Sequence, residues 1–139
     1  MTIVAAVTNS RESRYALIEA VAEARKLGSD LVAVNLGSTD LDLTSVDTDG
    51  VAIDVVDHRG KDTEDSTDAV LDEIARHKAT RLVIGVRRRT PVGKAILGSL
   101  SQRLLLHSPV PVLAVKLPED ELPSSAFDSL PAAMRRVTG

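Results

Sequence analysis

Short runs of apolar residues recur along the chain and predict the strands of a buried parallel sheet. The runs are rich in Val, Ile and Ala, which is typical of strands that are covered on both faces. Pro109 and Pro111 restrict the beginning of the last run to an edge or a non-donating position. The predicted strands span residues 3–7, 31–36, 51–56, 81–84 and 110–115.

Between these runs, apolar residues recur at helical spacing and predict three helices. The first begins at residue 10 or 11 and ends at Leu27, followed by Gly28 as its C-terminal stop. The second spans residues 63–77, and its acidic first turn suits the helix dipole. The third spans residues 98–107, with an inward face that consists of Leu100, Leu104 and Leu105.

The alternation of strands and helices predicts an α/β fold. We expect a single doubly wound sheet of five parallel strands in the order 3-2-1-4-5, with helices on both faces. Residues 37–50 have no periodic pattern, so we expect a loop there with at most one short helical turn. Ligands of such sheets bind beyond the carboxyl ends of the strands, where the strand order switches.

Composition excludes several classes of function. The chain has 139 residues, of which 43% are hydrophobic, but it has only one Tyr and one Phe, so a surface that stacks nucleic-acid bases is disfavoured. It has no Cys, which excludes disulfides, thiol catalysis and thiolate metal sites. The N-terminus lacks a basic leader, and no apolar run reaches the about 18 residues of a membrane span. We therefore expect a cytoplasmic protein without a membrane partner.

Charge is distributed unevenly along the chain. Residues 40–73 contain twelve acidic and two basic residues, whereas residues 74–118 contain nine basic and no acidic residues. Such a basic block can be a solvated face, or part of a dimer whose halves complement each other. The sharper alternative is an anion-binding site.

The stretch from residue 81 to residue 99 is the strongest candidate for function. We expect Gly85 to end a buried strand, and Gly98 and Ser99 to open a helix whose amides favour an anion. The loop between them carries four basic residues that could form a rim over this helix start: Arg87, Arg88, Arg89 and Lys94. Three consecutive arginines cannot all point into a core. A plain βα connection, whose glycines only permit turns, remains the alternative.

Other chemistries lack support in the sequence. A phosphate-binding loop of the Walker type would need glycine at Arg88 and a hydroxyl residue at Ala95, and no G-x-G-x-x-G follows the first strand. No serine lies in a G-x-S-x-G elbow. His58, His77 and His107 are not spaced as metal ligands. We therefore expect no catalytic residues and no metal site, and at most weak ATP hydrolysis.

The basic stretch and the end of the domain resemble the universal stress protein family. The family motif is G-x-x-G, nine residues and then G-[ST], and Gly85 and Gly98-Ser99 fit its spacing. Arg88 stands at the second glycine of the motif. The family's aspartate after the first strand corresponds to Thr8, and its following glycine corresponds to Asn9. The order of elements also fits over residues 1–117, which we take as the domain.

This resemblance implies an adenine-nucleotide alpha-hydrolase-like fold and a cytoplasmic stress-response protein that is commonly a homodimer. Many members bind ATP or another adenine nucleotide, which Mg²⁺ could accompany. The resemblance places adenosine near Thr8, Asn9 and Val34. It places the phosphates over the motif residues, which are Gly85, Arg88, Gly98 and Ser99.

Two interpretations of the changed motif stay open. Arg88 could clamp the phosphate or could fill the space that phosphate would occupy. In the second case the chain would be a dimeric regulatory or interaction protein that binds no nucleotide. Nucleic-acid binding is disfavoured, because the basic residues lie in one loop without aromatic partners.

We also expect contacts between two copies of the chain. An apolar edge strand from Val110 to Val115 invites antiparallel pairing with a second copy unless it is covered. Residues 118–139 contain three prolines and scattered charges, and we expect a tail that lies on the surface or on the partner subunit. The sequence does not identify other protein partners.

Overall fold

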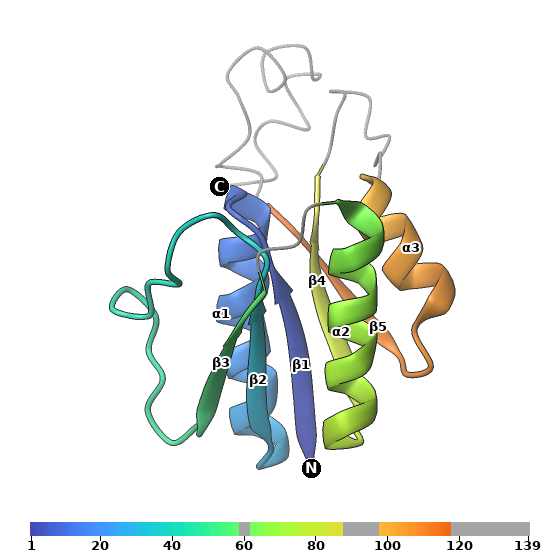
Figure 1. Ribbon diagram of the computed structural model, residues 1–139. Helices are drawn as coiled ribbons and strands as arrows, with labels where there is room; N and C mark the ends of the chain where they lie inside the picture. The colour runs from blue at the N-terminus through green and yellow to red at the C-terminus, as the bar shows by residue number, and fades with distance from the viewer. Residues whose placement is uncertain (59–61, 88–97, 118–139) are drawn as a thin grey trace, which may run out of the picture.

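One parallel sheet forms the centre of the molecule. The computed structural model describes residues 1–58, 62–87 and 98–117. Its strands run in the order β3-β2-β1-β4-β5, and every neighbouring pair is parallel, which confirms the predicted order (Figure 1). The strands are β1 (Thr2–Val7), β2 (Asp30–Asn35), β3 (Ile53–Asp57), β4 (Arg81–Val86) and β5 (Val112–Lys116).

The described helices cover both faces of the sheet, as predicted. α1 (Arg11–Leu27) lies on one face, whereas α2 (Thr63–His77) and α3 (Ser99–His107) lie side by side on the other (Figure 1). The chain moves in one direction across the sheet from β1 to β3, and in the other direction from β3 to β5. Right-handed connections therefore place the first helix on one face and the last two on the opposite face.

Apolar side chains pack in two clusters, one on each face of the sheet. Because successive residues of a strand point to opposite faces, Ile3 and Ala5 pack with α1 in one cluster. Val4 and Ala6 belong to the other cluster, which contains residues of α2 and α3. All four side chains are at most 4% exposed, so β1 is buried on both faces. This burial fixes the strand from which the candidate site is built.

The predicted strand bounds differ from the observed ones by at most two residues, and the last strand begins at Val112 rather than Val110. Two further details of the predicted elements are wrong. Gly85 does not end the fourth strand, because β4 continues to the buried residue Val86, and Gly85 itself pairs with Val115 of β5. Leu105 does not face inward, since its side chain is 38% exposed. Leu104 already occupies the buried stripe of α3, and the next residue is turned by about 100° around the helix axis.

The connection between β2 and β3 is a loop, as predicted, and it packs on the α1 face of the sheet. Residues 36–52 are all described, and none of them is helical. Instead of a helix, Leu41, Leu43 and Val46 pack against the cluster on the α1 face. The loop therefore supplies the apolar cover that a second helix would give on this face.

No helix within the described ranges is long and apolar enough to cross a membrane. The predicted tail, residues 118–139, lies outside the residues that the structure describes.

Candidate functional site

A cleft of about 560 Å³ lies at the carboxyl ends of β1 and β4. The N-terminus of α1 forms one wall and the N-terminus of α3 forms the other. Thr63, the first residue of α2, also lines the cleft, so the starts of all three described helices face the same space. The strand order switches at this point, because β2 pairs with one edge of β1 and β4 pairs with its other edge. Parallel α/β sheets bind ligands at such switch points.

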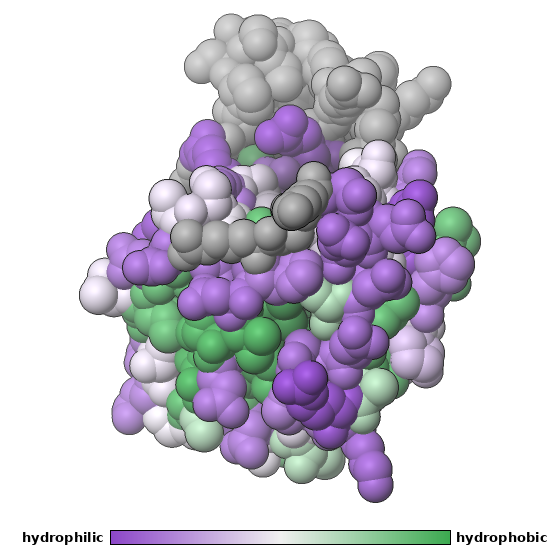
Figure 2. Space-filling model, viewed as in Figure 1, coloured by the Kyte–Doolittle hydropathy of each residue, from purple (hydrophilic) through white to green (hydrophobic). Residues whose placement is uncertain are grey.

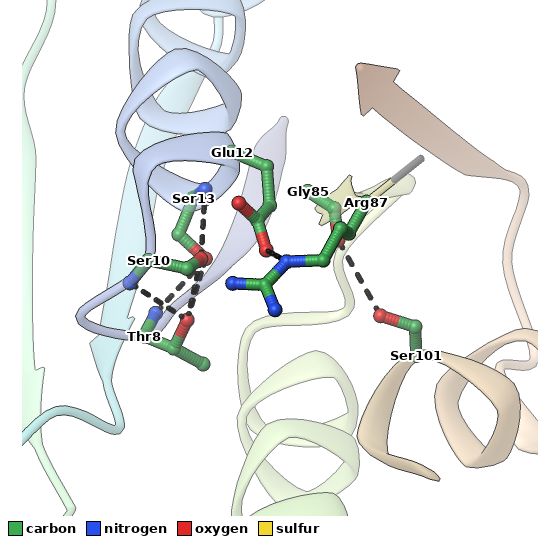
Figure 3. A network of polar contacts seen from close by, with 7 residues as sticks. All are labelled: Thr8, Ser10, Glu12, Ser13, Gly85, Arg87 and Ser101. Atoms are coloured by element: carbon green, nitrogen blue, oxygen red, sulfur yellow. Dashed lines mark hydrogen bonds and ion pairs between the residues drawn. The ribbon is translucent and has the colours of Figure 1, made fainter. Parts of the chain in front are cut away.

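Three hydroxyl side chains form a bonded cluster at the start of α1 (Figure 3). The Thr8 hydroxyl oxygen lies 2.9 Å from the hydroxyl oxygens of both Ser10 and Ser13. Ser10 is the N-cap of α1, and its hydroxyl accepts a hydrogen bond of 3.2 Å from the Ser13 amide. The Thr8 amide in turn donates to the Ser13 hydroxyl at 3.1 Å. These bonds fix the β1–α1 turn and the polar wall of the cleft.

Gly85 allows the backbone of α1 to approach β4 closely. A Cβ atom built on Gly85 would lie 2.6 Å from the carbonyl carbon and oxygen of Glu12 and 2.8 Å from the Ser13 amide nitrogen. No side chain fits there without a shift of the backbone. The glycine of the motif is therefore needed for contact between two parts of this chain, and this contact brings Glu12 to the cleft.

Glu12 and Arg87 form an ion pair at the mouth of the cleft, where their side chains point toward each other (Figure 3). The Arg87 Nε atom lies 3.4 Å from the Glu12 Oε1 atom. The side chain of Arg87 is 66% exposed, whereas that of Glu12 is only 11% exposed. A nearly buried carboxylate thus lines a cleft for which the sequence predicted only a basic rim. This pairing neutralises part of the charge that Arg87 could offer to a ligand.

The start of α3 carries no comparable charge. Gly98 is its N-cap and makes no side-chain capping bond, and the first turn has no acidic residue. The Gln102 amide donates to the Gly98 carbonyl. The amides of the three preceding helical residues, 99–101, therefore have no partner within the helix. The Ser101 hydroxyl reaches across the cleft and donates to the Gly85 carbonyl at 3.4 Å (Figure 3). This end of the cleft is suited to an anion.

Several of the predicted site residues meet in this cleft. Its lining includes Thr8, Gly85, Arg87, Gly98 and Ser99. The remaining residues of the predicted basic rim, Arg88, Arg89 and Lys94, lie outside the described residues.

Two other predicted site residues lie elsewhere. Asn9 turns away from the cleft and donates to the Ser38 hydroxyl at 2.9 Å. Val34 is fully buried and lines a separate hollow of about 320 Å³ between β3 and α2.

This second hollow has an apolar floor and an acidic rim. Figure 2 shows an apolar area in front of β2 and β3, beside the polar surface of α2. Val34 and Val56 form the floor of the hollow, and the carboxylates around it are Asp57, Asp65, Asp68, Asp72 and Glu73. Glu73 is paired with His77 at 3.0 Å and with Arg76 at 3.6 Å. Within the ranges that the structure describes, no group of three or more His, Asp or Glu side chains is arranged to hold a metal ion.

Sequence reasoning missed five polar residues of the cleft: Ser10, Glu12, Ser13, Thr63 and Ser101. One signal was present, because a serine directly before a predicted helix, as at Ser10, indicates an N-cap. The role of Glu12 had no such signal. Its ion pair joins the first helix to the end of the fourth strand, and only the folded chain brings these together.

Known proteins resemble this chain in sequence and in fold. Residues 51–116 match the model of the universal stress protein family. A universal stress protein of Mycolicibacterium smegmatis is 56% identical over 52 residues, which span 37% of this chain and only 40% of that relative.

Solved structures extend the likeness to most of the chain. A universal stress protein from Archaeoglobus fulgidus has a TM-score of 0.63 and 28% identity, over 84% of this chain and 98% of that chain. Another structure from the same organism, in complex with dAMP, has a TM-score of 0.56 and 23% identity, with the same coverage of both chains. Residues 51–116 therefore match the universal stress protein family, and the strand order and the solved structures show that the described chain has the fold of universal stress proteins.

Proposed function

We propose that this chain is a stress-response protein that binds an adenine nucleotide in the cleft between α1 and α3. The observation that carries the proposal is the convergence of Arg87, Gly98 and Ser99 with the hydroxyl cluster on one cleft at the switch point of the sheet. A volume of about 560 Å³ is within the range of small-molecule sites. A relative of the same fold was solved in complex with dAMP, which supports the same class of ligand here.

In this proposal the start of α3 and Arg87 hold the phosphate. The first amides of α3, which have no partner within the helix, and the helix dipole favour an anion by about 0.3 to 1 kcal/mol. A charge-assisted hydrogen bond from an arginine could add roughly 1.5 to 3 kcal/mol where the site is partly dry. Arg87 is two-thirds exposed, so the value for this residue lies at the lower end of that range. The hydroxyls of Thr8, Ser10 and Ser13 are suited to the ribose.

Calorimetry with AMP, ADP and ATP on the full chain tests this proposal. The blocking variant is Gly98→Leu, because a Cβ atom at Gly98 meets no described atom within 4 Å and Gly98 has an ordinary negative φ of −68°. We expect wild type to release heat on nucleotide binding. We expect Gly98→Leu to stay folded and to release no heat. Absence of heat with all three nucleotides, at protein and ligand concentrations up to the millimolar range, would contradict the proposal.

The second candidate is a homodimer that binds no nucleotide and works as a regulatory or interaction protein. The Glu12–Arg87 ion pair favours it, because this carboxylate already pairs with a basic group that lines the cleft. We propose that such a dimer forms through β5, which is the last strand on its side of the sheet within the described residues. Its side chains at Val112 and Val115 are only partly buried. Calorimetry separates the two candidates, and the oligomeric state tests the dimer itself.

A further inference from the structure

We propose that Glu12 determines how many phosphates a ligand of the cleft can carry, and that the cleft prefers a nucleoside monophosphate to a triphosphate. This inference rests on the proposed nucleotide binding. It concerns the choice among adenine nucleotides, which the fold alone leaves open.

The position of Glu12 is the first argument. Its side chain is 11% exposed and lines the cleft, and its carboxylate lies 3.4 Å from the Nε atom of Arg87. Glu12 also lies in the first turn of α1, where the helix dipole favours its negative charge. The Glu12 carboxylate therefore occupies one of the three helix starts that line the cleft.

The difference between the starts of α1 and α3 is the second argument. α1 has a hydroxyl N-cap and an acidic first turn, and its cap is bonded within the hydroxyl cluster. α3 has a glycine N-cap without a side-chain bond and has no acidic residue in its first turn. An anionic group of a ligand is therefore favoured at the α3 side and disfavoured at the α1 side. One phosphate can bind beside Gly98 and Ser99, while each further phosphate adds charge to a cleft that already holds a carboxylate.

Arg87 couples these two sides. Its side chain is 66% exposed, so it can turn from Glu12 toward a ligand at little cost in buried contacts. A ligand phosphate and Glu12 then compete for one guanidinium group. A second and a third phosphate bring further negative charge to a cleft that the Glu12 carboxylate already lines. Like charges in a partly dry site repel strongly enough to lower the affinity about tenfold.

The test compares the affinities of the full chain for AMP and ATP by calorimetry, at fixed ionic strength. Glu12→Gln removes the charge and keeps the shape of the side chain, and its control is Glu19→Gln, an exposed glutamate on the same helix that does not line the cleft. We expect Glu12→Gln to raise the affinity for ATP relative to AMP about tenfold. We expect Glu19→Gln to leave this ratio within about twofold of wild type, because its charge is screened by solvent.

A second variant keeps the test valid if Glu12→Gln does not fold. Arg87→Gln changes an exposed side chain and leaves the Glu12 carboxylate unpaired at the cleft. We expect Arg87→Gln to weaken the binding of ATP more than the binding of AMP. The control is Arg103→Gln, because Arg103 is an exposed residue of α3 that does not line the cleft; it should change both affinities equally.

Each outcome decides the inference. Nucleotide binding with an unchanged ATP-to-AMP ratio in both cleft variants would overturn the role of Glu12 and leave the proposed function intact. Nucleotide binding by Glu12→Gln but not by wild type would support the exclusion of phosphate by Glu12. It would also show that the natural chain does not have the proposed function. Absence of binding in wild type and in all variants would overturn both.

Discussion

Gly85 shows at the scale of a single residue how the sequence builds the cleft. Its missing side chain lets β4 lie against the backbone of Glu12 and Ser13, and this contact places the start of α1 beside the end of β4. The same contact presents the Glu12 carboxylate to Arg87, which follows β4 directly. A glycine that fits a ligand-binding motif therefore has a structural role of its own in this chain.

The variant Gly85→Ala tests this role. The added methyl group would lie 2.6 Å from backbone atoms of Glu12, so either α1 or β4 must shift. We expect the free energy of unfolding to fall by about 1 to 3 kcal/mol, as for other overpacked sites. Urea denaturation followed by circular dichroism measures the change.

Gly98→Ala is the matched control for this prediction. A Cβ atom at Gly98 meets no described atom within 4 Å, and we expect a loss of less than about 1 kcal/mol from the poorer N-cap. Equal losses in the two variants would show that Gly85 is not needed for the close approach of α1.

At the scale of elements, the loop between β2 and β3 replaces a helix and is held by side chains of α1. Arg25 donates to the carbonyl of Asp49 at 3.0 Å and to the carbonyl of Asp47 at 2.9 Å, and Arg14 donates to the Ser45 hydroxyl. Within the loop, hydrogen bonds from the hydroxyl and the amide of Thr44 lower the pKa of Asp42. These polar bonds hold the loop while its leucines cover the sheet.

The variant Arg25→Ala tests whether this arginine holds the loop. We expect the Val46 and Val51 amides, which are bonded to loop carbonyls, to exchange with deuterium about tenfold faster than in wild type. The strands should keep their protection. Hydrogen exchange followed by NMR measures both sets of amides.

Lys26→Ala is the control for the loop prediction, because Lys26 is an exposed neighbour in the same helical turn. Similar exchange rates for Val46 and Val51 in the two variants would show that the loop is held by its apolar contacts alone.

At the scale of the whole molecule, the fold could be predicted from the sequence, but the details of the site could only be predicted in part. The helix over residues 63–77 has the predicted bounds, because an acidic first turn and a basic last turn mark its two ends. The ends of the strands could not be predicted as closely, because runs such as the one through Gly85 and Val86 continue without a polar stop. Contacts between distant segments, such as the pairing of Glu12 with Arg87, leave no periodic trace in the sequence.

The proposed homodimer is also a property of the whole molecule. The Leu82 amide donates to the Pro111 carbonyl at 3.0 Å, so the alternation of a parallel ladder directs the amides of Val112 and Ala114 to the outer edge of β5. We expect wild type to have the mass of a dimer in light scattering at micromolar concentration. Ala114→Pro removes one outward amide and should shift the protein toward monomer without unfolding it.

Ala114→Thr keeps the amide and serves as the control for edge pairing. It should remain a dimer, because threonine is favourable in strands. A monomer mass for wild type would rule out the dimer, and a dimer mass for Ala114→Pro would show that another surface makes the contact.

The central claim is that an adenine nucleotide binds in the cleft between the starts of α1 and α3, and an NMR titration of the full chain with AMP tests it most directly. We expect saturable shifts of the amides of Thr8, Ser13, Gly85, Gly98 and Ser101, all of which line the cleft. Amides at the hollow between β3 and α2, such as those of Asp57 and Asp72, should change little. Shifts confined to that hollow, or no shifts at millimolar AMP, would contradict the claim.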